Sequence, residues 1–294
     1  MLSILIPTYH YNVYPLAQEL EKQALHSQIE FELICLDDGS FSNHNEENQR
    51  INALSHCKFV ERKSNLGRTA TRHELAELAN YEWLLFMDAD TFPKQHDFLL
   101  KLTQELSEHV DLVFGGIAYR SERPDSNTIL RWHYGRMREC KPVSQRIRSP
   151  YTSVISGGFA IRKALFLKVN QDLLQNAYGL DILFTSRLGS LNSVVKHIDN
   201  PVIHLGLEQN DDYLQKSKKA LETLSRLRSE KLISWNTTSL LKVHSILYTL
   251  GIAKIIGKLI KKYERRIERN LTGENPNLFV FDLYRLGYFC SIDF

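Results

Sequence analysis

The amino-acid sequence predicts an α/β protein with a mixed, mostly parallel sheet flanked by helices and a C-terminal helical extension. Short apolar runs alternate with helix-length segments in the first part of the chain, polar loops follow these runs, and the pattern becomes helical after about residue 210. Strands separated by helices are typical of parallel sheets with helices on both faces. The 294 residues, 43% of them hydrophobic, suffice for a substantial core.

Five apolar runs are predicted as strands: residues 2 to 6, 31 to 36, 58 to 61, 83 to 87 and 112 to 114. In parallel sheets ligands bind beyond the carboxyl ends of the strands. The polar loops after the first four runs should therefore meet at one edge of the sheet. They contain Pro7-Thr8-Tyr9, Asp37-Asp38-Gly39-Ser40, Asn65-Leu66-Gly67-Arg68 and Asp88-Ala89-Asp90.

Asp37 and Asp38 precede a glycine that favours a turn. One of them is suited to accept the imino proton of a uracil-like base or to bind a ribose hydroxyl. The alternative is that an aspartate at this strand end caps the following helix.

Arg68 and Arg72 lie four residues apart at the start of a predicted helix, residues 69 to 78. They share one face of this helix, and guanidinium groups suit an anionic phosphate. The alternative is an ion pair with Glu74, Glu77 or another surface carboxylate.

Asp88 and Asp90 follow the fourth, fully apolar run. Residues at positions i and i+2 of an extended segment point to the same side, and two carboxylates there can share a divalent ion with a diphosphate. Asp-x-Asp is common in turns, so its position after a buried strand and three polar loops carries the prediction.

The motifs IPTYHY, LDDGS, SNLGRTATRHELA and MDADTF, in this order, resemble the nucleotide-sugar-binding half of inverting family 2 glycosyltransferases with the GT-A (Rossmann-like) fold. Similarity continues through SGGFAIRKALF, YGLDILFTSRL and HIDNPVIHLGLE, to about residue 210. It implies a glycosyltransferase domain over 1–210, with a nucleotide-sugar-binding half (1–115) and an acceptor-binding half (116–210). A helical C-terminal extension, 211–294, follows.

The resemblance also implies roles for single residues. The implied nucleotide-binding residues are Pro7, Thr8, Tyr9, Asp38, Asn65, Arg68, Arg72 and Asp88. The implied ligands of Mn²⁺ or Mg²⁺ are Asp90 and His204, although a histidine in PVIHLG is equally an ordinary strand residue. The implied general base is Asp181, whose alternative role is to stabilise the N-terminus of a helix. The family usually has Glu-Asp at this point, and this chain has Leu180-Asp181.

These implied roles describe a metal-dependent hexosyltransferase that moves one sugar, with inversion, from a nucleotide-sugar, favoured as a UDP-sugar, to a hydroxyl of a saccharide or lipid-linked saccharide. Such a reaction belongs to surface glycan synthesis. The alternatives are a degenerate GT-A domain acting as a membrane-associated scaffold, and a sugar nucleotidyltransferase. Nucleic-acid binding is not predicted, because basic residues are not spread over an aromatic platform.

Residues 127 to 140 are predicted as a helix. Its aromatic side chains either lie near the acceptor or cover the sheet.

The C-terminal extension is predicted as two continuous helices, residues 211 to 231 and 239 to 271. Residues 242–269 hold eight Lys or Arg and two Glu, a balance of +6 in a chain of net charge +3. A basic amphipathic helix of this kind either lies on an anionic membrane surface or packs its apolar side on the protein. The aromatic tail, 275–294, is expected to fold onto these helices or to form an interface.

No apolar run approaches the roughly 20 residues of a membrane span, and the N-terminal segment lacks the features of a signal peptide. Cys35, Cys57, Cys140 and Cys290 have no metal-type spacing and are predicted to be reduced core thiols. We therefore expect a cytoplasmic protein, peripheral on the inner face of the cytoplasmic membrane if the basic segment binds lipid. The sequence does not predict an oligomeric state.

Overall fold

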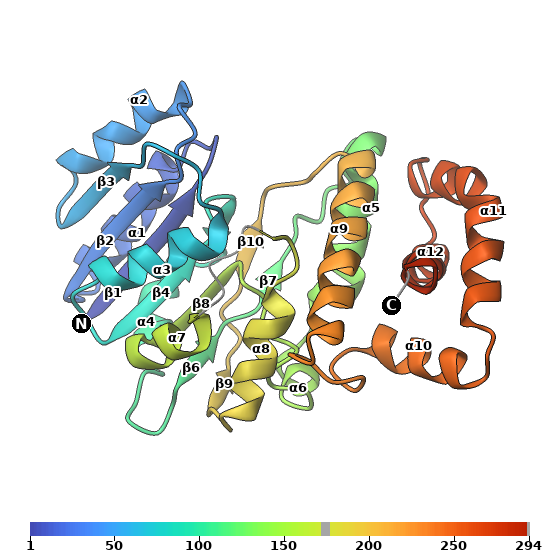
Figure 1. Cartoon of the computed structure of the whole chain (residues 1–294). Helices are drawn as coiled ribbons and strands as arrows, with labels where there is room; N and C mark the ends of the chain where they lie inside the picture. The colour runs from blue at the N-terminus through green and yellow to red at the C-terminus, as the bar shows by residue number, and fades with distance from the viewer. Residues whose placement is uncertain (172–176, 293–294) are drawn as a thin grey trace. The chain divides into compact units, whose positions relative to one another are not determined.

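The computed structural model describes residues 1–171 and 177–292 (Figure 1). The chain divides into two compact units. The sheet unit comprises Met1–Arg120, Glu139–Asn176 and Arg187–Gly206, and the helical unit comprises Ser121–Arg138, Ala177–Ser186 and Leu207–Phe294. The predicted extension, 211–294, lies within the helical unit, which also takes two earlier segments from the predicted acceptor-binding half.

A seven-stranded sheet with the strand order β3-β2-β1-β4-β8-β6-β9 forms the centre of the sheet unit. Only β8 runs against its neighbours; the pairs β1–β2, β1–β4, β2–β3 and β6–β9 are parallel. The prediction of a mixed, mostly parallel sheet is confirmed. The strands are β1 (Leu2–Thr8), β2 (Phe31–Asp37), β3 (Cys57–Glu61), β4 (Trp83–Met87), β6 (Leu112–Phe114), β8 (Gly158–Arg162) and β9 (Val195–His197).

Alternating side chains of the central strands enter two apolar layers. Leu2, Ile4 and Ile6 of β1 pack in one cluster with residues of α1 and α4, whereas Phe86 of β4 contacts Phe159 of β8 and Phe166 of α7. Each such side chain contributes roughly 1.5–3 kcal/mol when it is fully buried. The helices of this unit are α1 (Tyr14–His26), α2 (His44–Asn48), η1 (Gln49–Ala53), α3 (Arg68–Leu78), α4 (Phe98–Thr103), α6 (Val143–Arg146) and α7 (Lys163–Asn170).

A second, three-stranded sheet lies in the same unit and was not predicted. Its order is β5-β10-β7, with β5 at Thr91–Pro93, β10 at Val202–His204 and β7 at Ile117–Ala118. Strands of two or three residues are too short to show a periodicity in the sequence. Their pairing matters for the site, because β10 runs antiparallel to β5 and sets His204 opposite Thr91.

The helical unit is built from α5 (Ile129–Tyr134), α9 (Asn210–Ser229), α10 (Ser239–Thr249), α11 (Ala253–Leu271) and α12 (Leu278–Ser291). α8 (Asp181–Ser190) begins in this unit. The predicted helix over residues 127 to 140 is wrong in detail: η2 (Ser126–Thr128), α5 and a π-helical turn, η3 (Gly135–Glu139), replace one regular helix. The aromatic tail forms α12, whose Phe281 and Tyr284 are buried with Leu130 and Leu271.

The prediction of a continuous helix from residue 239 to 271 is also wrong. α10 and α11 are bent by 115° at Gly251, which has φ +72°. The N–H of Gly251 donates to the carbonyl oxygen of Tyr248, and that of Ile252 to the carbonyl oxygen of Leu247, a Schellman motif that ends α10. The apolar periodicity continues across the break and conceals it. Within the described residues no single helix has the length and apolar character of a membrane span, and this bent pair meets such a test only when its helices are taken together.

All four cysteines are free thiols. Cys35 and Cys290 are buried, as predicted, whereas Cys57 and Cys140 are partly exposed. Burial raises the pKa of the Cys35 thiol well above its ordinary value, and that of Cys290 to about 11, so both are protonated at neutral pH.

Candidate active site

The loops that follow β1, β2 and β3 are joined by backbone hydrogen bonds at the carboxyl edge of the sheet. The N–H of Asp38 donates to the carbonyl oxygen of Thr8 at 3.0 Å, and the N–H of Arg62 donates to that of Asp37 at 2.9 Å. These residues are brought together because β1, β2 and β3 are parallel neighbours. The structure therefore gathers the first three predicted loops at one place.

Asp38 is buried and holds the third loop against the second. Its carboxylate accepts hydrogen bonds from Arg62 at 2.5 Å and from the N–H groups of Leu66 and Gly67 at 2.9 and 2.8 Å. Gly39 has φ +67°, and a Cβ there would lie 2.6 Å from the backbone of Ser64, so only glycine allows this approach. Asp38 thus has a structural role, and its predicted contact with a base would be additional.

Unsatisfied polar atoms lie beside this aspartate. The Oγ1 atom of Thr8 and the Oδ1 atom of Asp37 are buried and have no hydrogen-bond partner among the described residues. Asp37 uses its other oxygen to accept from the N–H of Ser40 in a local turn; it does not cap the following helix, α2, whose N-cap residue is Asn43. Tyr9 is exposed and Pro7 is partly exposed. Since buried polar groups are normally paired, this is a place where a bound ligand can supply partners.

Arg68 and Arg72 meet at Asp88 and at Ser156. Both arginines donate to the carboxylate of Asp88, Arg72 at 2.7 Å. Arg68 donates to the Ser156 hydroxyl at 2.9 Å, and Arg72 to the Ser156 carbonyl oxygen at 2.6 Å. Two guanidinium groups thus lie together at this loop, and guanidinium groups suit a diphosphate. Asn65 lies exposed in the preceding loop.

The ionisation of Asp88 follows from this pairing. Burial alone would raise the pKa of the Asp88 carboxyl, but Arg68 and Arg72 outweigh that effect and lower it below the ordinary value. Asp88 is therefore ionised at neutral pH, and in the absence of donor it holds both arginines.

Asp90 and His204 approach each other across the small sheet. The Oδ2 atom of Asp90 lies 3.5 Å from Nε2 of His204, and the N–H of Leu205 donates to the carbonyl oxygen of Asp90 at 2.8 Å. The His204 ring packs over that of Tyr119, with centroids 5.4 Å apart, and the Tyr119 hydroxyl donates to Glu139 at 2.5 Å. The structure thus brings together the two predicted metal ligands, which are 114 residues apart in the sequence.

The spacing of these two donors fits a divalent ion. Adjacent ligands of an octahedral Mg²⁺ or Mn²⁺ ion, bound at about 2.1 Å, lie about 3 Å apart, close to the distance observed. Among residues 1–171 and 177–292 no group of three or more His, Cys, Asp or Glu has the arrangement of a metal site. An ion at Asp90 and His204 would thus take its other ligands from water and phosphate, as Mg²⁺ usually does.

Gly206 is essential to this geometry and was not predicted. A Cβ atom on Gly206 would lie 2.0 Å from Oδ2 of Asp90 and 2.8 Å from its Cγ. Arg62, Ser156 and Tyr119 were also missed. The sequence carries a weak signal for three of the four: Arg62 follows a strand directly, Ser156 opens the SGG motif, and Gly206 stands two residues after His204.

Asp181, the predicted base, belongs to the helical unit and is the exposed first residue of α8. Gly179 has φ +93°, and its missing side chain leaves room for Ala220 of α9, 3.1 Å from where a Cβ would be. Leu180, which stands where the family usually has Glu, is buried. The turn 178–180 therefore anchors the start of α8, and Asp181 follows this turn directly.

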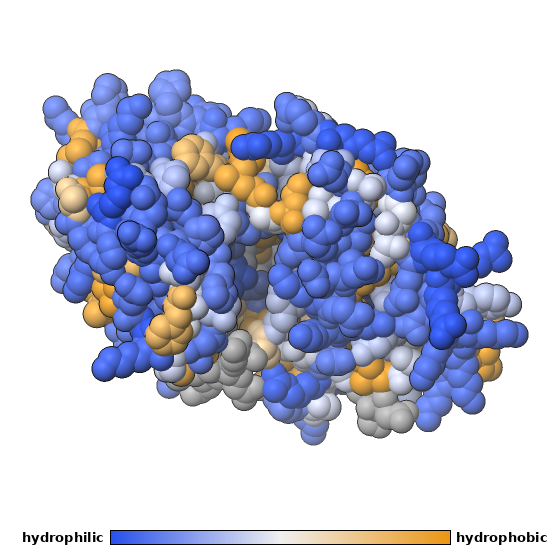
Figure 2. All heavy atoms as spheres, turned by 90° about the horizontal axis from the view of Figure 1, so that it is seen from above, coloured by the Kyte–Doolittle hydropathy of each residue, from blue (hydrophilic) through white to orange (hydrophobic). Residues whose placement is uncertain are grey.

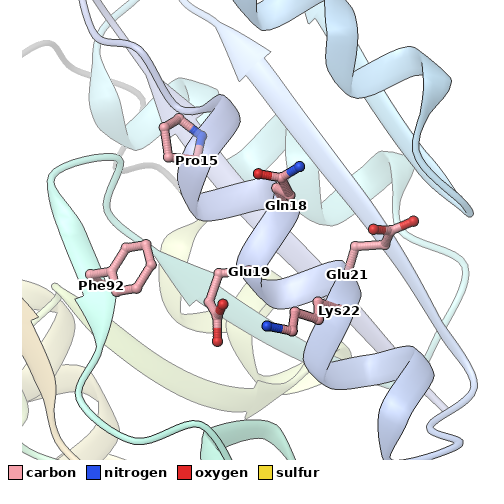
Figure 3. Close-up of a pocket in the computed structure, with 6 residues that line it drawn as sticks. All are labelled: Pro15, Gln18, Glu19, Glu21, Lys22 and Phe92. Carbon is pink, nitrogen blue, oxygen red and sulfur yellow. The ribbon is translucent and has the colours of Figure 1, made fainter.

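A separate hollow of about 580 Å³ lies beside α1 (Figure 3). Its lining residues are Pro15, Gln18, Glu19, Glu21, Lys22 and Phe92. Figure 3 shows the ring of Phe92 pointing toward α1. Charges of both signs line the hollow, and Glu19 already accepts a hydrogen bond from Gln23. We assign it no part in the reaction.

Several solved structures have a fold similar to that of this chain. A mannosyltransferase, PcManGT, from Pyrobaculum calidifontis in complex with GDP-Man and Mn²⁺ has a TM-score of 0.54 at 13% identity, over 78% of this chain and 64% of that one. Residues 1–349 of TarS from S. aureus, in complex with UDP-GlcNAc, have a TM-score of 0.51 at 18% identity, over 99% and 90%. Mannosyl-3-phosphoglycerate synthase from Rubrobacter xylanophilus has a TM-score of 0.54 at 15% identity, over 80% and 76%.

The sheet order, the Asp-x-Asp loop and these similarities define the class: the protein has the GT-A fold of glycosyltransferases. The profile of Glycosyl transferase family 2 matches residues 3–169, more than half of the chain, and the chain belongs to that family. The resemblance recognised in the sequence is thereby confirmed, as is its assignment to the glycosyltransferases. No curated protein sequence matches the chain. The chain covers less than two thirds of the length of PcManGT.

Proposed function

We propose that the protein is a metal-dependent, inverting glycosyltransferase that transfers one sugar from a nucleotide-sugar to a hydroxyl group of a saccharide or lipid-linked saccharide in surface glycan synthesis. The observation that supports this most directly is the pair of neighbouring clusters at Asp88 and Asp90. One holds two arginines for a diphosphate, and the other holds a carboxylate and an imidazole for a divalent ion.

Donor binding is assigned to the loops after β1 to β4. Thr8, with its unpaired buried hydroxyl, and Asp38 line the base and ribose end, together with Pro7 and Tyr9. Arg68 and Arg72 would exchange part of their contact with Asp88 for the more highly charged diphosphate. UDP is the favoured nucleotide from the LDDGS resemblance; PcManGT and TarS were solved with different bases, GDP and UDP, so they do not decide this point.

Asp90 and His204 are assigned as ligands of Mn²⁺ or Mg²⁺, the metal binding that their 3.5 Å separation fits. When bound, this ion would offset the negative charge that develops on the departing nucleoside diphosphate. Arg68 and Arg72 would act on the same charge.

Asp181 is assigned as the general base. Its carboxylate would accept the proton of the acceptor hydroxyl while that oxygen attacks the anomeric carbon on the face opposite the nucleoside diphosphate, which inverts the configuration. Leu180 cannot make the hydrogen bonds of the usual Glu, so we propose that contacts to the acceptor come from other side chains.

The test is a screen of UDP-sugars and GDP-sugars for release of nucleoside diphosphate with Mn²⁺, Mg²⁺ or EDTA. It is followed by transfer assays with Asp181→Asn. We expect unchanged donor affinity and a transfer rate lower by about 100 to 10,000-fold, the usual contribution of a positioned base. Asp212→Asn is the matched control, because Asp212 is also an exposed acid in the first turn of a helix.

Equal transfer by Asp181→Asn and the parent would refute the assignment of the base. Metal-independent release, or no release from any donor, would refute the proposed reaction and favour a scaffold. Formation of a nucleotide-sugar from a sugar phosphate would instead identify a nucleotidyltransferase.

A further inference from the structure

The outer sides of α10 and α11 carry an unusual set of exposed large hydrophobic side chains. Seven such residues, each between 37% and 64% exposed, lie within 21 consecutive positions of the chain: Val243, Ile246, Leu250, Ile252, Ile255, Leu259 and Tyr263. We call this set the apolar corner, because the 115° bend at Gly251 lies at its centre. Single exposed hydrophobic residues are ordinary, but a contiguous group of this size marks an interaction site.

The opposite side of each helix explains why this set stays exposed. Gly257 and Ile260 of α11 pack on α12, where a Cβ on Gly287 would lie 2.4 Å from Ile260. At about 100° per residue, Ile255 and Leu259 lie on the side of α11 opposite Gly257. His244 of α10 likewise contacts Phe289 of α12, at a ring-centroid distance of 4.9 Å, and Ile246 lies on the opposite side of α10. The apolar corner therefore remains after the helices have packed on α12.

Basic side chains surround the apolar corner. Lys or Arg occupies eight positions between residues 242 and 269, and all eight are exposed: Lys242, Lys254, Lys258, Lys261, Lys262, Arg265, Arg266 and Arg269. Within the described parts of the chain none of these eight forms an ion pair with a carboxylate. Figure 2 shows strongly hydrophilic side chains next to hydrophobic ones over α11.

The two acidic residues of this segment offset only a small part of that charge. Glu264 and Glu268 both accept from Lys218 of α9, at 2.8 and 3.5 Å, and Glu268 also accepts from the hydroxyl of Tyr284 at 2.8 Å. Both carboxylates are thus engaged within the helical unit, and the eight basic residues outnumber them. The outer side of α11 presents positive charge beside apolar side chains, a combination that complements an anionic lipid bilayer.

We propose that the apolar corner and its eight basic residues dock the protein on an anionic lipid bilayer, with α10 and α11 lying at the surface. The bend at Gly251 presents the hydrophobic side chains of both helices at the headgroup and acyl boundary, while Lys and Arg contact anionic headgroups. A nucleic acid would match the charge alone and leave the hydrophobic side chains in water. Docking rests on the helical unit by itself and does not depend on the proposed transfer reaction, although it would suit a lipid-linked acceptor.

The test is co-sedimentation of the full chain with vesicles of neutral phosphatidylcholine, with and without about 30% phosphatidylserine or phosphatidylglycerol. The charge variant is Lys258→Gln, Lys261→Gln, Arg265→Gln. Each basic residue near a membrane contributes a factor of about five, so the triple change should lower the partition coefficient by roughly 100-fold. The matched control makes the same change of net charge on the sheet unit, at the exposed Lys58, Lys94 and Lys168.

The apolar contribution is tested with Ile255→Ser, Leu259→Ser, whose side chains do not pack on α12. This double variant should lose at least about 10-fold in binding to anionic vesicles, while its circular dichroism and melting temperature stay at the parent values. We expect binding to fall with rising salt and to be weak on neutral vesicles.

Three results would overturn the proposal. One is the absence of binding to anionic vesicles at low salt, and another is an equal loss in the control variant with changes on the sheet unit. The third is a dimer, seen by analytical ultracentrifugation, that Ile255→Ser, Leu259→Ser dissociates while vesicle binding is absent; the apolar corner would then be an interface between two copies of the chain.

Discussion

Replacing Gly206 by Ala tests the metal site without removing either proposed ligand. The added Cβ would lie 2.0 Å from Oδ2 of Asp90, and ordinary van der Waals contact begins at 3.4 Å, so this oxygen must retreat by about 1.4 Å (3.4 − 2.0). Bonds from ligands to a metal vary by only about 0.2 Å. Asp90 would therefore leave the position from which it shares an ion with His204.

We expect the affinity for Mn²⁺ to fall by about 10 to 100-fold, the usual effect of disturbing a residue that orients a metal ligand. The fold should be almost unaffected, because Gly206 does not have a positive φ and the side chain of Asp90 is 32% exposed and can turn toward solvent. The assay is the Mn²⁺ concentration that gives half-maximal release of nucleoside diphosphate, together with Mn²⁺-dependent thermal stabilisation in the presence of UDP. The Asp90→Ala variant, which lacks the proposed ligand, gives the lower limit of the affinity for Mn²⁺.

Gly157→Ala is the matched control. Its Cβ would meet only the ends of the Ile117 and Thr91 side chains, at 3.3 and 3.5 Å, in the same part of the sheet unit. A Gly206→Ala variant with the parent Mn²⁺ dependence would show that Asp90 does not bind the ion or that Gly206 does not position it.

Three further outcomes follow from the contacts. Burial by itself raises the pKa of the Asp88 carboxyl, but the two paired arginines lower it overall. The ionised carboxylate therefore stabilises the fold fully above the unfolded pKa of about 3.9, and this stabilisation is lost as pH falls through the lower folded pKa. The melting temperatures of the parent and Asp88→Asn should converge only in strong acid, and a constant difference from pH 2 to 7 would contradict this. Arg62→Met leaves the buried carboxylate of Asp38 without its cation and should cost about 3 to 5 kcal/mol in denaturant unfolding, against less than about 1 kcal/mol for the exposed Arg50→Met. Gly287→Ala places a Cβ 2.4 Å from an isoleucine of α11 and should cost about 1 to 3 kcal/mol by the same measurement; parent stability would mean that α11 and α12 separate freely.

Much of the proposed nucleotide end of the site could be predicted from local pattern. The run from Trp83 to Met87 is buried throughout, as its composition predicts, and Asp88 follows at its end. Gly39 adopts positive φ in the loop where a turn-forming residue was expected, and Gly67 adopts it as well. In a sheet of parallel neighbouring strands, the residues after each strand must meet at one edge, so the chain order of these loops was enough to predict that they converge.

Contacts between residues on different elements could not be predicted from the sequence. The structure shows Arg62 on Asp38, Ser156 beneath both site arginines, and Tyr119 against His204. None of these pairs shares a periodicity, because the two members lie on different elements. The bend at Gly251 had a local signal, a glycine in a helical pattern, but the amphipathic spacing continued on both sides and favoured a straight helix.

The sequence by itself determined the class of fold, the first strands of the sheet, and Asp88 and Asp90 as candidates, because burial and backbone preference act within a few residues of the chain. His204 became a candidate only through the family resemblance of its motif. Only the tertiary structure decided that β10 pairs with β5 and carries His204 to 3.5 Å from Asp90, that Gly206 leaves the space for it, and that α12 covers one side of α11 and leaves the other exposed. Such distances are set by the packing of complete elements against one another, and a one-dimensional pattern does not contain them.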